Sequence, residues 1–168
     1  GGSPMDAAKA IATLAVQERT DEEIFAGGYA PVALPMAHVP TTAGTGSEVT
    51  PYSILTNDAK HTKTSISSPA MFPHLAYLDG KYMRDLPAAT TVNTALDAFS
   101  HAIEGMLSRN ATPLSDALAG ESLRILYPLL SKTAGTLTLE ERDTLLYASA
   151  LAGMTIAQSG TTAVHRMG

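Results

Sequence analysis

The stretch that decides the fold is Pro40-Thr41-Thr42-Ala43-Gly44-Thr45-Gly46-Ser47-Glu48, which directly follows an apolar run at 32–39. We expect that run to be a buried strand. In open α/β sheets, ligands bind just beyond the carboxyl ends of the strands. Three Thr hydroxyls and one Ser hydroxyl, with glycines between them, can surround a phosphate or a ribose. On these residues alone, an ordinary polar surface loop is an equally good interpretation.

A second small-residue segment, Gly1-Gly2-Ser3-Pro4-Met5-Asp6, precedes a predicted helix that Ser3 caps and that ends near Gln17. Small residues let the backbone approach a ligand closely, and the positive end of a helix dipole favours an anion such as pyrophosphate. A capped helix after a turn explains the same residues, and taken alone this simpler interpretation is favoured.

Strands and helices alternate up to Leu86-Pro87. We expect a hairpin from 52–56 and 62–67, joined at Asn57-Asp58, and a short strand at 75–78. This alternation is typical of an α/β unit.

Beyond Pro87 the pattern predicts helices only. We expect them at 88–108, from Thr112-Pro113 to about Leu126, and from the capping box at Thr138 to about Gln158. A further helical turn carries His165. In the first of these helices one apolar stripe is formed by Leu96, Phe99, Ile103, Met106 and Leu107.

Asp97 and His101 lie four residues apart, which places them on one helix face about 40° from each other. A carboxylate and an imidazole there can ligate one divalent metal. Glu104 and Ser108 share that side, opposite the apolar stripe. A solvated face with an Asp–His contact is therefore the better interpretation of the pair alone. Taken alone, His165 is equally typical of a packed or surface histidine.

Composition narrows the class of protein. Hydrophobic residues make up 45% and charged residues 16%, which is typical of a chain that buries a core. The net charge of −5 argues against a nucleic-acid partner. The absence of cysteine excludes disulfides and thiolate metal sites and fits a cytoplasmic location. No apolar run is long enough to span a membrane, so we expect no membrane partner. Without an initiator Met or a closing element, we expect an incomplete piece of a longer protein.

Together, these segments resemble the iron-containing, or group III, alcohol dehydrogenases. The stretch from Pro40 through Val49-Thr50 is similar to that family's signature loop almost letter for letter. Gly1 to Asp6 resembles its pyrophosphate loop, and Leu96-Asp97-Ala98-Phe99-Ser100-His101-Ala102-Ile103-Glu104 resembles its metal-binding helix. Three weak signals in the right order are jointly strong.

The resemblance implies a dehydroquinate-synthase-like fold, α/β plus all-α. Residues 1–87 would form the Rossmann-like dinucleotide-binding α/β domain without its N-terminal part. Residues 88–168 would form the helical metal-binding domain without its C-terminal part.

The implied activity is hydride transfer between NAD or NADP and a small alcohol or aldehyde held on a divalent metal, iron(II) ahead of zinc. The metal ligands would be Asp97, His101 and His165, with a last histidine beyond Gly168. The cofactor residues would be Gly1, Gly2, Ser3, Asp6, Thr41, Thr42, Thr45, Gly46, Ser47 and Lys63. The full-length protein would be a homo-oligomer.

Two other interpretations stay open. One is a glycerol dehydrogenase-like enzyme or a dehydroquinate synthase, against which the stretch Thr45-Gly46-Ser47-Glu48 argues. The other is a truncated or degenerate non-catalytic fragment that keeps only nucleotide-binding elements. With three ligands in view, we expect this chain alone to bind metal weakly and to be inactive.

Overall fold

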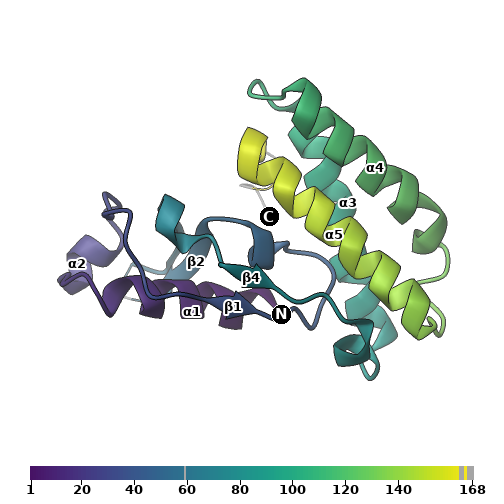
Figure 1. The fold of residues 1–168 in the computed structure, drawn as a ribbon, viewed down its shortest axis with the longest axis horizontal. Coiled ribbons are helices and arrows are strands. Elements are labelled where there is room, and N and C mark those ends of the chain that lie inside the picture. The colour runs from purple at the N-terminus through teal and green to yellow at the C-terminus, as the bar shows by residue number, and fades with distance from the viewer. Residues whose placement is uncertain (59, 163–164, 166–168) are drawn as a thin grey trace.

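The computed structural model describes residues 1–58, 60–162 and 165. Figure 1 shows two parts side by side: a bundle of three long helices, and a part built from one long helix, short strands and loops. The bundle contains α3 (Ala88–Leu107), α4 (Pro113–Leu130) and α5 (Leu139–Ser159). Within the described residues, no helix is both long and apolar enough to cross a bilayer.

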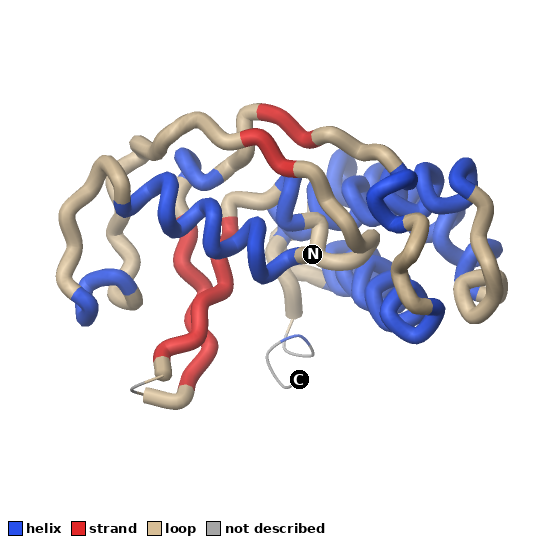
Figure 2. Tube along the Cα trace, turned by 90° about the horizontal axis from the view of Figure 1, so that it is seen from below, coloured by secondary structure: helices blue, strands red, loops and turns tan. Residues whose placement is uncertain are grey.

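The predicted hairpin is confirmed. Strands β2 (Tyr52–Asn57) and β3 (Thr62–Ser67) pair antiparallel, with Tyr52 opposite Ser67 and Asn57 opposite Thr62. Helix α1 (Gly2–Leu14) packs against β2, and the turn of the hairpin points away from the rest of the molecule (Figure 2).

The strand expected at 32–39 is mostly irregular. Only β1 (Ala37–His38) forms a ladder, parallel to β4 (Leu75–Ala76), which is itself shorter than expected. The Pro35 ring supplies no ladder donor. The Leu34 amide is directed instead to the Ala12 carbonyl of α1, at 2.9 Å.

The bounds of two helices differ from the prediction. Helix α1 begins at Gly2 with Gly1 as its N-cap, so Ser3 lies inside the first turn and caps nothing, and the helix ends at Leu14. Helix α4 continues through Pro128 to Leu130. Because Pro128 lies in the last turn, its missing N–H costs a single backbone bond near the helix end.

The other capping signals are confirmed. Thr112 caps α4, and Thr138 accepts from the Glu141 amide while Glu141 accepts from the Thr138 amide, which is the reciprocal box predicted for α5. The short α2 (Asp21–Ile24) has the same kind of box at Thr20.

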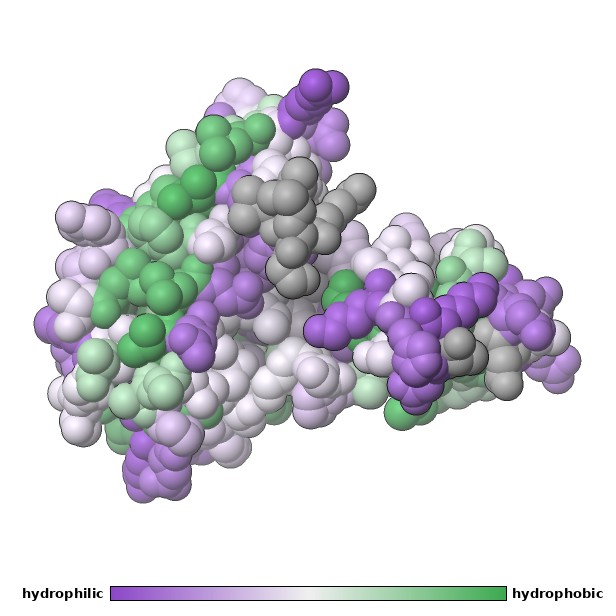
Figure 3. All heavy atoms as spheres, turned by 180° about the vertical axis from the view of Figure 1, so that it is seen from behind, coloured by the Kyte–Doolittle hydropathy of each residue, from purple (hydrophilic) through white to green (hydrophobic). Residues whose placement is uncertain are grey.

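Helix α3 faces the other way from what its apolar stripe suggested. Leu96, Ile103, Met106 and Leu107 are exposed, whereas the buried side carries Ala95, Ala98, His101, Ala102, Glu104 and Gly105. Small residues allow close helix packing: a Cβ on Gly105 would lie 2.3 Å from Thr155 Cγ2 of α5. The band of exposed apolar side chains along the bundle is visible in Figure 3. On the predicted solvated face, His101 and Glu104 are therefore buried, while Asp97 and Ser108 are only half-buried.

Two clusters of buried apolar residues support a domain boundary near Leu86-Pro87, which we retain as a proposal. One cluster lies among the three long helices and includes Leu126, Leu145 and Leu146, and the other joins Ala10, Tyr29, Ile66 and Met71. Ala43 of the signature loop belongs to the helical cluster, so this loop lies where the two parts meet.

Candidate metal and dinucleotide site

The two predicted cofactor segments lie against each other. The Gly1 backbone nitrogen donates to Thr41 Oγ1 at 2.7 Å. A Cβ on Gly2 would lie 2.7 Å from Thr45 Cγ2, so only glycine fits there. The N-terminus of α1 therefore abuts the loop, and Ser3 and Thr41 beside it are exposed while Thr42 is half-buried.

The loop is also locked against the helical bundle. Gly46 has φ 61°, in the left-handed region, and a Cβ on it would lie 2.6 Å from Gly153 Cα of α5. The position therefore demands glycine twice, for conformation and for space. After Gly46 a short 3-10 turn, Ser47–Val49, buries Ser47 and Glu48.

Asp6 and Ser47 are paired with each other inside the protein. Ser47 Oγ donates to Asp6 Oδ1 at 2.6 Å, and Asp6 Oδ2 accepts from the Ile54 amide of β2 at 3.1 Å. These contacts join α1, the loop and the hairpin, so the two side chains brace the site.

Sequence reasoning missed Lys9, which is fully buried beneath this brace. Its Nζ donates to Ser47 Oγ at 2.9 Å and to the Tyr52 carbonyl at 2.8 Å. Lysine is ordinarily exposed, so its residue type does not predict burial. The hydrogen-bond partners of Lys9 lie about forty residues further along the chain, and only its place three residues after Asp6 could have drawn attention to it.

Lys63 is not brought to the loop by any described contact. It lies exposed on β3 opposite Thr56, close to the hairpin turn. Its assignment to the cofactor remains a prediction.

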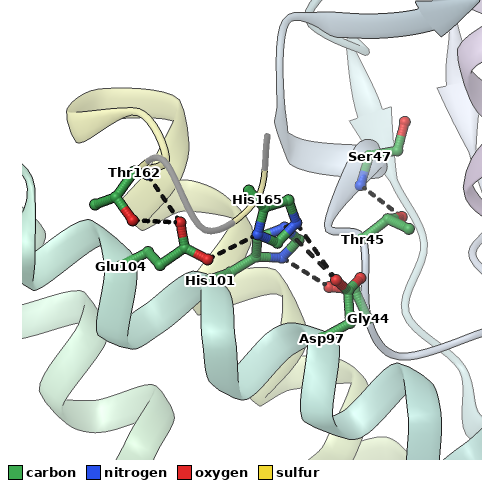
Figure 4. A network of polar contacts seen from close by, with 8 residues as sticks. All are labelled: Gly44, Thr45, Ser47, Asp97, His101, Glu104, Thr162 and His165. Carbon is green, nitrogen blue, oxygen red and sulfur yellow. Dashed lines mark hydrogen bonds and ion pairs between the residues drawn. The ribbon is translucent and has the colours of Figure 1, made fainter. Parts of the chain in front are cut away.

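The three predicted metal ligands come together. Asp97, His101 and His165 offer ligand atoms that all lie within 4.8 Å of one another. The His165 Nε2 atom lies 3.5 Å from Asp97 Oδ1 and 2.9 Å from His101 Nε2 (Figure 4). The helical turn expected around His165 otherwise lies outside the described residues.

Each histidine is oriented by an acceptor at its other nitrogen. His101 Nδ1 lies 3.2 Å from the Gly44 carbonyl, and His165 Nδ1 lies 2.8 Å from Glu104 Oε1. Both Nδ1 atoms must carry hydrogen to make these bonds. The two Nε2 atoms lie 2.9 Å apart and face each other, which leaves both directed at the space beside Asp97 where an ion could bind.

Glu104 is the second residue whose role the sequence did not indicate. It is buried, and its Oε2 accepts from both the amide and the hydroxyl of Thr162, each at 2.8 Å. Burial alone would raise its pKa, but the bonds from His165 and Thr162 outweigh burial and lower the pKa of Glu104. An ionised Glu104 thus faces His165 and fixes its ring.

His101 is held as a neutral ligand. Burial lowers the pKa of His101; Asp97 opposes that shift and His165 adds to it. A neutral imidazole is the form that binds a metal.

The signature loop contacts both the predicted metal ligand His101 and the predicted cofactor segment at the start of α1. Gly44 accepts from His101, while its neighbours Thr41 and Thr45 contact the N-terminus of α1 (Figure 4 shows the metal side). A Cβ on Gly44 would lie 2.8 Å from the Thr94 carbonyl of α3, which explains the close approach.

Comparison with known families gives a consistent result. The iron-containing alcohol dehydrogenase model matches residues 1–80, and the C-terminal model of the Fe-containing alcohol dehydrogenase family matches residues 91–168.

Individual relatives match along the whole chain. The NAD-dependent methanol dehydrogenase of Bacillus methanolicus is 34% identical over 98% of this chain and 44% of its own length. The iron-containing alcohol dehydrogenase of Thermotoga maritima superimposes with a TM-score of 0.87 at 46% identity, over 98% of this chain and 45% of that one. Sulfoacetaldehyde reductase of Bifidobacterium kashiwanohense, solved with NAD+, gives 0.86 at 33% identity over 98% and 45%.

The chain spans less than half the length of these relatives, 44% of the methanol dehydrogenase. Within that span the two family models match one after the other along the chain. The chain belongs to the iron-containing alcohol dehydrogenase family.

Proposed function

We propose that the protein containing this chain transfers a hydride between a nicotinamide dinucleotide and a small alcohol or aldehyde held on a divalent metal. The observation that carries the proposal is the position of Gly44. Its carbonyl accepts from the proposed ligand His101. In the same loop, Thr41 accepts from the terminal amine of Gly1 and Thr45 lies against Gly2, at the helix N-terminus proposed to face the pyrophosphate. One loop therefore sets the distance between cofactor and metal.

The ligand group fits a divalent ion. Two protein donors at about 2.0–2.2 Å from one ion lie roughly 3 to 3.5 Å apart. The distances among Asp97 Oδ1, His101 Nε2 and His165 Nε2 are 2.9, 3.5 and 3.9 Å. Two imidazoles and one carboxylate suit iron(II) or zinc. The family relationship favours iron.

When bound, the metal would supply a Lewis acid for the substrate oxygen and the nicotinamide would supply or accept the hydride. The chain's own residues would position both groups. Asp97, His101 and His165 would hold the ion, while Glu104 and the Gly44 carbonyl keep the imidazoles oriented. The N-terminus of α1 would attract the pyrophosphate through its free amides.

The relatives support NAD as the cofactor. The Bacillus methanolicus enzyme is NAD-dependent by name, and the Bifidobacterium structure holds NAD+. A remnant that binds nucleotide only would have no need of two histidines, each oriented by its own acceptor, and the ligand group therefore favours the enzyme. We propose that the 168-residue chain alone is inactive, because it spans less than half the length of its relatives.

The test is an anaerobic assay of the complete protein encoded by the reading frame that contains this chain. With iron(II) loaded and butyraldehyde as substrate, we expect NADH or NADPH to be consumed. The double variant Asp97→Ala/His101→Ala should bind cofactor but show no turnover. Lack of turnover with iron and with zinc, across several aldehydes and alcohols, would contradict the proposal.

A further inference from the structure

Lys9 is a lysine with no access to solvent, at the centre of the contact between α1, the signature loop and β2. Its side chain is 0% exposed. Its Nζ donates to Tyr52 O at 2.8 Å, to Ser47 Oγ at 2.9 Å and to Thr50 Oγ1 at 3.3 Å. The three acceptors match the three N–H groups of an ammonium ion.

The charge on Lys9 is balanced locally. Asp6 Oδ1 lies 4.0 Å from Nζ, and the buried Glu48 also favours the ammonium form. His38 of β1 and Tyr52 of β2 are the other titratable groups around it. A buried ammonium is costly unless it is paired and hydrogen-bonded. A fold that keeps one under a ligand loop therefore gains something specific from it.

We propose that Lys9 is a positioning residue of the dinucleotide site: its ammonium group holds Ser47, and through Ser47 the Asp6 carboxylate, in the geometry that the cofactor requires. The inference rests on the proposed cofactor site and adds a residue to it. Ser47 is the link, because its Oγ accepts from Lys9 and donates to Asp6. Asp6 then accepts from the Ile54 amide, which extends the brace to the hairpin.

This brace is sensitive to alkaline pH. Burial lowers the pKa of Lys9 to about 8, against the opposing effect of Asp6 and Glu48. A neutral amine has two N–H groups for three acceptors, so one contact is lost when Lys9 loses its proton. Burial also lowers the pKa of His38 and raises those of Glu48 and Tyr52.

Stability and cofactor affinity should respond to pH in opposite directions. The unfolded chain, with a Lys pKa of about 10.4, binds more protons than the folded one between pH 8 and 10.4, so the Lys9 contribution to stability rises over that range. Cofactor affinity needs the ammonium and should fall over the same range. A lysine with a merely structural role would not separate the two.

The experiment measures the dissociation constant of NADH by fluorescence from pH 6.5 to 9.5 in the complete protein, with thermal unfolding at each pH. We expect wild-type affinity to fall with a midpoint near pH 8. Lys9→Met should bind NADH roughly tenfold more weakly at pH 7, the effect of losing hydrogen bonds to a charged group. Its affinity should not change with pH. The matched control, Lys60→Met in the exposed hairpin turn, should behave as wild type.

Thr50→Val keeps the lysine and the fold but removes one acceptor of the ammonium. It should move the midpoint of the affinity profile to lower pH, and this result tests the proposal even if Lys9→Met does not fold. Equal pH profiles for wild type and Lys9→Met, or an unmoved midpoint in Thr50→Val, would overturn the role of Lys9 and leave the cofactor site standing. Absence of NADH and NADPH binding in wild type at every pH would overturn both proposals.

Discussion

The two imidazole rings of the candidate metal site stack with their centroids 4.4 Å apart and present both Nε2 atoms to the same side as Asp97. Their Nδ1 atoms point away from this position, toward the Gly44 carbonyl and the Glu104 carboxylate. A metal ion bound there would take one ligand atom from each of these two histidines and from Asp97. Orientation by a carbonyl and a carboxylate is the usual way in which proteins fix such ligands.

Glu104 provides a test at the scale of single residues. Removing the acceptor of His165 Nδ1 in Glu104→Ala should weaken metal binding by roughly 10- to 100-fold, since the ring is free to turn. Competition with a chromophoric chelator measures the affinity directly. Glu121→Gln, an exposed glutamate paired with Arg124 on α4, is the control and should retain wild-type affinity. Unchanged metal affinity in Glu104→Ala would show that Glu104 does not orient His165.

At the scale of elements, α3 shows what a hydrophobic pattern can and cannot predict. The spacing of Asp97 and His101 correctly placed both on one face. The direction of that face was wrong, because the pattern weighs large apolar residues, whereas the buried side combines alanine and glycine with polar residues such as His101 and Glu104. The buried face of α3 is set by the close approach of α5 at Gly105. The periodicity of apolar residues within α3 carries no information about this contact with a distant segment.

Lys9 illustrates the same limit within α1. Its helix was predicted, although its cap was misplaced from Gly1 to Ser3. The three acceptors of Lys9 come from the loop and the hairpin, so its burial depends on tertiary contacts that no helical period encodes. By contrast, the capping box at Thr138 and the Asn57-Asp58 turn were predicted because their signals are local.

Two helical glycines give opposite predictions. A Cβ on Gly153 of α5 would lie 2.9 Å from Gly46 Cα and 3.0 Å from Gly46 O, both backbone atoms of the signature loop. Gly153→Ala should therefore destabilise the fold by about 1–3 kcal/mol. Gly120 of α4 has nothing within 4 Å of its Cβ position. Gly120→Ala should stabilise by about 0.5–1 kcal/mol, measured by denaturant unfolding. A stabilising Gly153→Ala would refute the proposed contact between loop and helix.

At the scale of the whole molecule, the exposed apolar band on α3 is the most conspicuous surface. Leu107 is 73% exposed and Leu96 47% exposed, and Ile103 and Met106 continue the band. Contiguous apolar surface of this kind promotes association in water. The apolar stripe predicted from the sequence therefore lies on the surface, and no other described residue covers it.

We therefore expect the isolated 168-residue chain to self-associate. Sedimentation velocity should show concentration-dependent species for wild type and fewer of them for Ile103→Gln/Leu107→Gln, which makes the centre of the band polar. Tyr127→Gln, at an exposed aromatic residue of α4, should not reduce association. A monodisperse wild-type sample with a cooperative thermal transition would contradict this expectation.

The family and the order of its motifs were readable from the sequence because three short signals keep their spacing. The contacts between these three segments could not be predicted from the sequence, because they join distant residues. Gly44 and His101, for example, are 57 residues apart. The proposed function depends on that contact, because it brings the proposed cofactor and metal sites together at one loop.

Crystals of the complete protein, loaded anaerobically with iron(II) and NAD, would test it most directly through an anomalous difference map at the iron edge. We expect a peak within about 2.0–2.2 Å of a ligand atom of each of Asp97, His101 and His165. We also expect dinucleotide density along Gly1–Gly2 and Thr41–Thr45. A fully loaded metal bound elsewhere, with these three side chains uncoordinated, would contradict the proposed function.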